Sequence, residues 1–65
     1  MTLPQFYALK PGDQVWHTAT ISGEPALASV LKVWPEDFLV KLLDENENRE
    51  IQAEYSELHL TKETA

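Results

Sequence analysis

The chain has 65 residues, of which 11 are acidic and 5 are lysine or arginine, so its formal net charge at pH 7 is -6. A chain of this length forms one domain and buries only about 60% of the surface that its unfolded form exposes, which argues against a deep substrate cleft or a large buried cofactor. It contains no cysteine, which excludes disulfides, thiolate metal sites and a cysteine nucleophile.

The N-terminus and the scattered basic residues bear on location and partners. The first nine residues, MTLPQFYAL, contain a proline and lack the basic start of a secretory signal. No stretch reaches the roughly 20 apolar residues of a membrane-spanning helix, so we expect a cytoplasmic protein that does not contact membranes. The five basic residues form no cluster in the sequence, which disfavours nucleic-acid binding because that affinity comes from lysines and arginines that neutralise phosphates.

Turn-forming residues divide the chain at regular intervals. They occur at residues 11–13 (PGD), 22–25 (SGEP), 35–37 (PED) and 44–48 (DENEN). Spacings of about 8 to 12 residues between such turns are typical of an all-β sandwich or barrel. The turn at 44–48 offers oxygen ligands, but it lacks the glycine and the distal glutamate of a calcium loop, so we predict no metal site there.

Alternation of side chains predicts the first three strands. In the first segment one face carries Val15, His17, Ala19 and Ile21, and the other carries Trp16, Thr18 and Thr20. In residues 26–34 one face carries Leu27, Ser29, Leu31 and Val33, and the other carries Ala28, Val30, Lys32 and Trp34. Both faces of this second segment are largely apolar, so we expect a central, curved strand. Residues 38–43 follow a tight turn and are predicted to pair with it as an antiparallel hairpin, with Lys41 facing outward.

The C-terminal part of the chain fits two secondary structures. The first consists of a strand over residues 49–53, one helical turn at 55–58 and a closing strand at 58–61, which explains the order of apolar and polar residues. Ile51, Tyr55 and Leu58 also recur at helical spacing, so one amphipathic helix over residues 49–62 is the alternative. We favour two strands, because a lone helix would leave only three strands for the sheet. Residues 62–65 are predicted to be a frayed tail.

The segments KPGDQVW, ASVLKVWPEDFLVKLLD and REIQAEYSELHL occur in an order that resembles the SH3-like small barrels, and more narrowly their Tudor and KOW-type members. The resemblance covers residues 10–61 and implies a single small five-stranded barrel with one helical turn before the last strand. SH3-like barrels are in general binding modules and assembly subunits rather than enzymes. The chain departs from KOW-type RNA binders, which carry basic residues and a glycine where residues 35–37 lie here. It also departs from peptide-binding SH3 domains, whose long first loop carries an aromatic pair and acids.

An apolar segment, residues 1–9, precedes the barrel. We expect it to pack across an open end of the barrel. The alternative is an arm that offers Phe6 and Tyr7 to a partner.

Aromatic residues are the strongest candidates for a binding site, because large rings anchor binding surfaces as often as they fill cores. The predicted partner-binding residues are Trp16, Trp34, Phe38 and Tyr55. Tudor-like barrels hold a methylated cation in an aromatic cage with acids nearby, and the resemblance implies that Asp37 or Glu54 would supply the acid. The alternative is that at least two of the four rings belong to the core.

No pair of residues has the spacing that catalysis or metal binding requires. His17 is predicted to be a partly buried strand residue and His59 a solvated one, and they would form a cluster only if the first and last strands were neighbours. We therefore predict no catalytic residue, no metal and no cofactor.

The sequence thus predicts a non-enzymatic protein-interaction or complex-assembly module that binds a protein partner. Like charges oppose self-association, so we expect a monomer, and the acids within residues 44–57 could steer a basic partner. The alternative is a Tudor/KOW-type nucleic-acid-associated module, which requires Lys10, Lys32 and Lys41 to cluster on one face.

Overall fold

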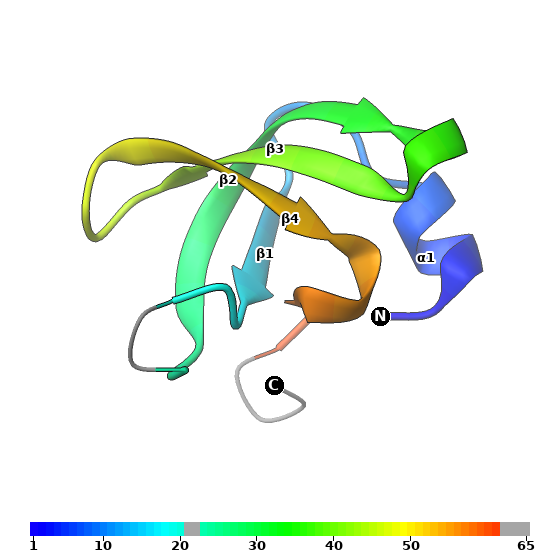
Figure 1. The fold of residues 1–65 in the computed structure, drawn as a ribbon. Coiled ribbons are helices and arrows are strands. Elements are labelled where there is room, and N and C mark those ends of the chain that lie inside the picture. Colours follow the sequence, from blue (N-terminus) through cyan, green and yellow to red (C-terminus); the bar gives the residue numbers. More distant parts are fainter. Residues whose placement is uncertain (21–22, 62–65) are drawn as a thin grey trace.

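The computed structural model describes residues 1–20 and 23–61, which form one antiparallel sheet with a short helix and two 3-10 turns (Figure 1). The strands are β1 (Gln14–His17), β2 (Ala26–Trp34), β3 (Leu39–Asp44), β4 (Arg49–Glu54) and β5 (Leu58–His59). They lie in the order β4-β3-β2-β1-β5, so β2 is central, as its two apolar faces predict. The expectation of an all-β chain with five strands is confirmed, and the sheet is open.

The C-terminal part forms two strands rather than one helix. β4 runs antiparallel beside β3, and a 3-10 turn, η2 (Tyr55–Glu57), leads into β5, which pairs with β1. β5 comprises only two residues, so the closing strand is shorter than the predicted segment 58–61. The predicted tail, residues 62–65, lies outside the described residues.

β1 is also shorter than the alternation predicts. It ends at His17, and the next backbone N–H, that of Thr18, donates to the carbonyl of Glu57 in η2 at 3.1 Å. Ala19 lies beyond the strand and still packs against the core. Ile21, the last residue of the predicted strand, lies outside the described residues.

A β-bulge in β2 changes which side chains face the core. Val30 is buried opposite Leu42, but the register with β3 then shifts, so that Lys32 lies opposite Lys41. Leu31 is the extra residue, and beyond it Val33 packs against the core. The prediction that Val30 and Lys32 share a face is therefore wrong, because an inserted residue reverses the alternation and bends the strand. Figure 1 shows this curvature of β2.

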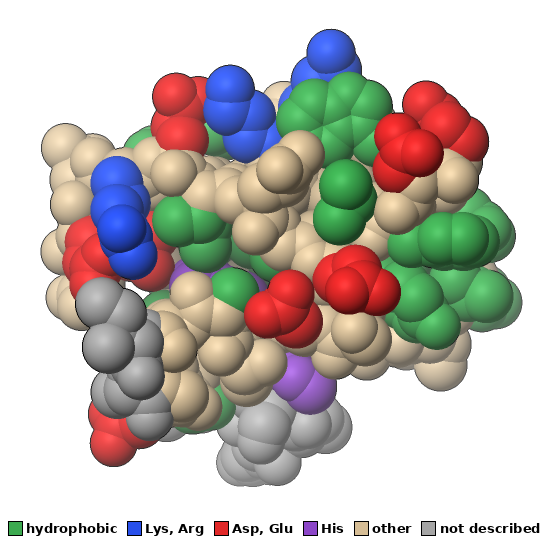
Figure 2. Space-filling view, viewed as in Figure 1, with side chains coloured by type: hydrophobic (Ala, Val, Ile, Leu, Met, Phe, Trp, Pro, Cys, Tyr) green, Lys and Arg blue, Asp and Glu red, His purple; other side chains and the backbone are tan. Residues whose placement is uncertain are grey.

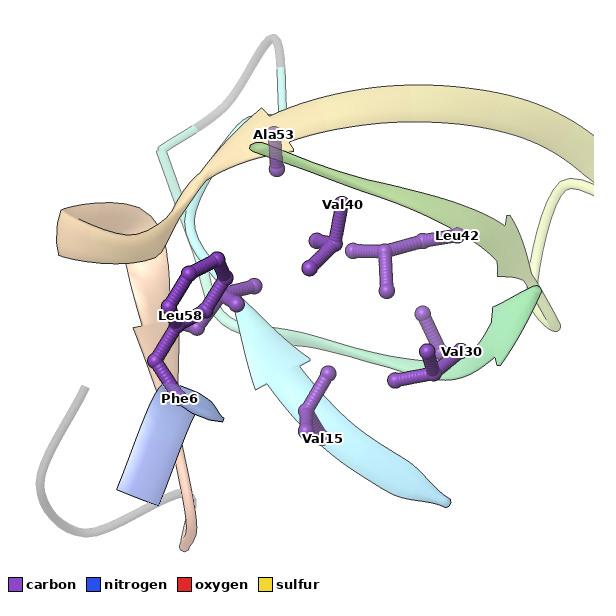
Figure 3. Packing of buried hydrophobic residues seen from close by; sticks show 8 residues of the cluster. Phe6, Val15, Val30, Val40, Leu42, Ala53 and Leu58 are labelled. Atoms are coloured by element: carbon purple, nitrogen blue, oxygen red, sulfur yellow. The ribbon is translucent and has the colours of Figure 1, made fainter. Parts of the chain in front are cut away.

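The core lies on the inner face of the curved sheet, where apolar side chains from the strands and the N-terminal segment point into one interior (Figure 3). It consists of eight buried residues, Phe6, Val15, Ala28, Val30, Val40, Leu42, Ala53 and Leu58. The members on β3 are two residues apart because neighbouring side chains of a strand point to opposite faces.

The N-terminal segment forms a short helix, α1 (Leu3–Tyr7), which the sequence analysis did not predict. Thr2 caps it: the Thr2 hydroxyl accepts from the backbone N–H of Gln5 at 3.4 Å, and Gln5 Oε1 accepts from the backbone N–H of Thr2 at 2.9 Å. The four residues TLPQ carry this signal, a capping box with proline in the first turn. α1 places Phe6 in the core, whereas Tyr7 is 54% exposed.

Candidate functional site

Four aromatic residues form a series of ring contacts where α1, η2 and a second 3-10 turn, η1 (Pro35–Asp37), come together. The ring centroids of Tyr7 and Phe6 are 5.6 Å apart, those of Phe6 and Tyr55 are 5.8 Å apart, and those of Tyr55 and Phe38 are 5.7 Å apart. Tilted pairs at these distances are favourable beyond the area they bury. We call Tyr7, Tyr55 and Phe38, with the buried Phe6 between them, the aromatic surface.

Phe38 has an unusual backbone conformation in this surface. Its φ of 56° and ψ of 33° lie in the left-handed region, which bulky side chains rarely occupy. Its N–H donates to the carbonyl of Pro35 at 3.3 Å, and its carbonyl accepts from the N–H of Tyr55 at 2.9 Å. The side chain remains 39% exposed. Phe38 thus ends η1, and β3 begins one residue later than predicted.

Acidic residues border the aromatic surface. Glu36 and Asp37 lie in η1, while Glu54 and Glu57 lie at the two ends of η2. Figure 2 shows acidic side chains near η1 beside the hydrophobic side chains around α1. Glu57 Oε1 also accepts from the backbone N–H of Glu54 at 3.1 Å, which fixes η2. Both acids implied by the resemblance, Asp37 and Glu54, are exposed beside this surface.

Trp34 lies in a different setting, on the outer face of the sheet. The Nζ atom of Lys32 lies over its indole, 5.3 Å from the ring centroid. Trp34 lines a surface hollow together with Lys41, Glu50, Ile51 and Gln52.

Trp16 is half-buried and lies opposite His59 and Leu27 in the sheet. It lines another hollow, formed with Pro25, Ala26, Leu27, Glu45 and Asn46. Of the four predicted partner-binding residues, the structure therefore joins Phe38 and Tyr55 in ring contact and places Trp16 and Trp34 at other hollows. Tyr7 joins the first two, and the signal for it was the apolar N-terminal segment.

His17 and Asp44 form a buried polar pair that the sequence analysis missed. His17 is fully buried, not partly buried as predicted, and its Nε2 atom lies 3.2 Å from Asp44 Oδ2. Asp44 Oδ1 accepts from the backbone N–H groups of Asn46 and Glu47 at 2.9 and 3.0 Å. The bond from Glu47 is the main cause that holds the pKa of Asp44 below its ordinary value, although burial opposes it.

The two histidines do not meet. His17 is opposite Leu58 in the sheet, whereas His59 is opposite Trp16, so their side chains point to opposite faces. His59 is half-buried rather than solvated. Within residues 1–20 and 23–61 no group of three acidic or histidine side chains is arranged to hold a metal ion.

Two further findings concern membrane-spanning helices and similarity to known proteins. In the described part of the chain, no helix is both long and apolar enough to cross a membrane. Comparison of the chain with protein-family models, with curated proteins and with solved structures gave no match.

Proposed function

We propose that the chain is a non-enzymatic protein-interaction or complex-assembly module with an SH3-like barrel fold, acting as a cytoplasmic monomer. The strand order β4-β3-β2-β1-β5, with η2 directly before the last strand, supports this fold. The bulge in β2 supports it too, because bulges bend strands and help a sheet curl toward closure.

The exposed ring of Phe38 carries the functional proposal. A bulky residue in the left-handed region costs on the order of 1 kcal/mol relative to glycine. The chain nevertheless holds a phenylalanine there, with 39% of the residue exposed and its ring against Tyr55. A partner that covers Phe38 and Tyr7 gains apolar burial at residues that the fold leaves uncovered.

The acids around the aromatic surface indicate the charge of the partner. Residues 34–39 and 54–57 contain four carboxylates and no lysine or arginine. An acidic rim accelerates association with a basic protein segment, and an arginine or lysine of that segment gains further by lying over an aromatic ring. The partner expected here is therefore a protein with a basic segment.

Affinity capture from a lysate of the source organism tests the proposal. Wild type is compared with Phe38→Gly, which suits the backbone and removes the ring, and with Leu31→Ala. Leu31 is the matched control, since its exposure of 38% equals that of Phe38 within a percentage point and it lies on another face.

We expect a protein that wild type and Leu31→Ala both retain, in low and high salt, and that Phe38→Gly loses. Equal capture by Phe38→Gly and wild type contradicts the proposed surface. Capture of nucleic acid alone, and only in low salt, contradicts the protein-interaction function.

A further inference from the structure

Two lysines face each other on the outer side of the sheet. Lys32 of β2 lies directly opposite Lys41 of β3. Like charges at directly opposite positions repel, and this destabilises the pairing of the strands. The contact of Lys32 with Trp34 and an ion pair of 3.0 Å between Lys41 Nζ and Glu50 Oε1 reduce that cost. The two ammonium groups of this pair thus have one ion-paired carboxylate between them, that of Glu50.

The hollow beside these lysines has the groups that recognise a nucleotide. Trp34 supplies an indole ring, on which a nucleobase can stack. Lys41 supplies an ammonium group for phosphate oxygens, and the exposed amide of Gln52 can both donate to and accept from a base edge.

We propose that this hollow binds a nucleoside phosphate, with the base against Trp34 and the phosphate between Lys32 and Lys41. A bound phosphate replaces the repulsion between the two ammonium groups with two attractive contacts. Glu50 competes with it for Lys41. A mononucleotide suits the site better than a long strand, because the negative field of the whole chain repels each additional phosphate. The site is separate from the aromatic surface and does not depend on the function proposed for it.

Two-dimensional NMR with three probes tests the proposal on the full chain. ADP carries both base and phosphate, adenosine carries the base alone, and pyrophosphate carries the phosphate alone. Titration to about 10 mM detects a site as weak as about 1 mM. We expect ADP to shift the indole N–H of Trp34 and the amides of Lys32 and Lys41. Adenosine and pyrophosphate should each bind at least about tenfold more weakly, since each makes only part of the contacts.

Four variants at surface positions show which groups act. Lys32→Gln and Lys41→Gln should each weaken ADP binding on the order of fivefold, because each removes a charge-assisted contact. Lys10→Gln is the matched control: it changes the net charge equally but lies outside the hollow, and it should leave the affinity unchanged. Glu50→Gln should tighten binding, because it frees Lys41.

Several results would overturn the proposal. The first is that ADP shifts none of these signals. The second is that pyrophosphate binds as tightly as ADP without shifting the Trp34 indole. The third is that Lys10→Gln and Lys41→Gln reduce the affinity for ADP equally. Tetra-adenylate tests whether the hollow binds a nucleic-acid strand rather than a single nucleotide. If tetra-adenylate shifts the signals of Trp34, Lys32 and Lys41 while ADP does not, the result contradicts a mononucleotide site. If tetra-adenylate and ADP bind with equal affinity per site, the result supports a mononucleotide site.

Discussion

Asp44 accepts a hydrogen bond from His17, a residue 27 positions earlier in the chain, inside the protein. Because the carboxylate is ionised at neutral pH, Nε2 of His17 carries the hydrogen and donates it over 3.2 Å. The other ring nitrogen, Nδ1, is buried without a hydrogen-bond partner among the described residues. One carboxylate thus connects β1 to the turn between β3 and β4, which it also caps through its second oxygen.

Removal of this carboxylate should make the chain less stable in a way that depends on pH. The pKa of Asp44 is lowered in the folded state, so its contribution is complete well above the ordinary value of 3.8 and is lost as the pH falls through the lowered folded-state pKa. We expect Asp44→Ala to reduce the free energy of unfolding by about 2 kcal/mol at neutral pH, because it leaves two backbone N–H groups unpaired.

Asp44→Asn isolates the charge, since its amide oxygen can still cap the turn. Urea unfolding should show wild type more stable than Asp44→Asn at pH 7, with the difference closing as the pH falls below 3.8 and through the lowered folded-state pKa of Asp44. Asp37→Asn, at an exposed acid, is the control. A difference that stays constant across this range would show that the charge of Asp44 does not contribute.

At position 38 the glycine variant should be more stable than the alanine variant, which reverses the usual order of stability. Phe38→Ala loses the ring contact with Tyr55 and keeps the strain of a positive φ, whereas Phe38→Gly loses the same contact and removes the strain. We expect the glycine variant to be more stable than the alanine variant by about 1 kcal/mol, measured by thermal and urea unfolding. An alanine variant as stable as the glycine variant would mean that the conformation of Phe38 is not strained.

Local patterns in the sequence were enough to predict much of the fold. Alternation in β3 and the turn residues on either side of it identify the hairpins, because one buried face needs a period of two. The spacing of Ile51, Tyr55 and Leu58 fits a helix equally well, and the preference for two strands came from the need to complete a sheet. The residues TLPQ also carry a local signal, the capping box that begins α1.

Other features depend on contacts between distant residues. The bulge at Leu31 follows from how β2 and β3 fit together, and no residue in the segment indicates it. The pairing of His17 with Asp44 arises only when β1 and β3 lie on either side of β2. For the same reason the sequence named Phe38 and Tyr55 as candidates but could not show that they touch or that Trp34 lies elsewhere.

Phe6 should be the most costly residue of the N-terminal segment to remove. Its side chain is fully buried, and replacement of a buried phenylalanine by alanine costs about 3–5 kcal/mol. For a chain of this size that lowers the melting temperature by at least about 12 °C. Tyr7→Ala, at the exposed neighbouring ring, should change it by only a few degrees. Differential scanning calorimetry checks both, and equal effects would mean that α1 is not part of the core.

The bulge predicts that deletion of Leu31 and deletion of Val33, both in β2, affect folding differently. Without Leu31, Val30 and Val33 still face the core and Lys32 still faces out, so the chain should fold with a straighter strand. Without Val33, Trp34 would move to the inner face, where the core has no space for it. Circular dichroism and amide NMR spectra should show a folded chain for the first deletion and an unfolded one for the second. Unfolding of both would show that the curvature itself is essential.

The most direct measurement is hydrogen–deuterium exchange on the complex with the captured partner protein. If the aromatic surface is the binding site, binding should slow exchange at the amides of residues 36–38 and 54–57 and leave the outer face of β2 and β3 unchanged. The same complex should not form with Phe38→Gly. Protection confined to the outer face of the sheet, or to the hollow beside Trp16, would contradict the account.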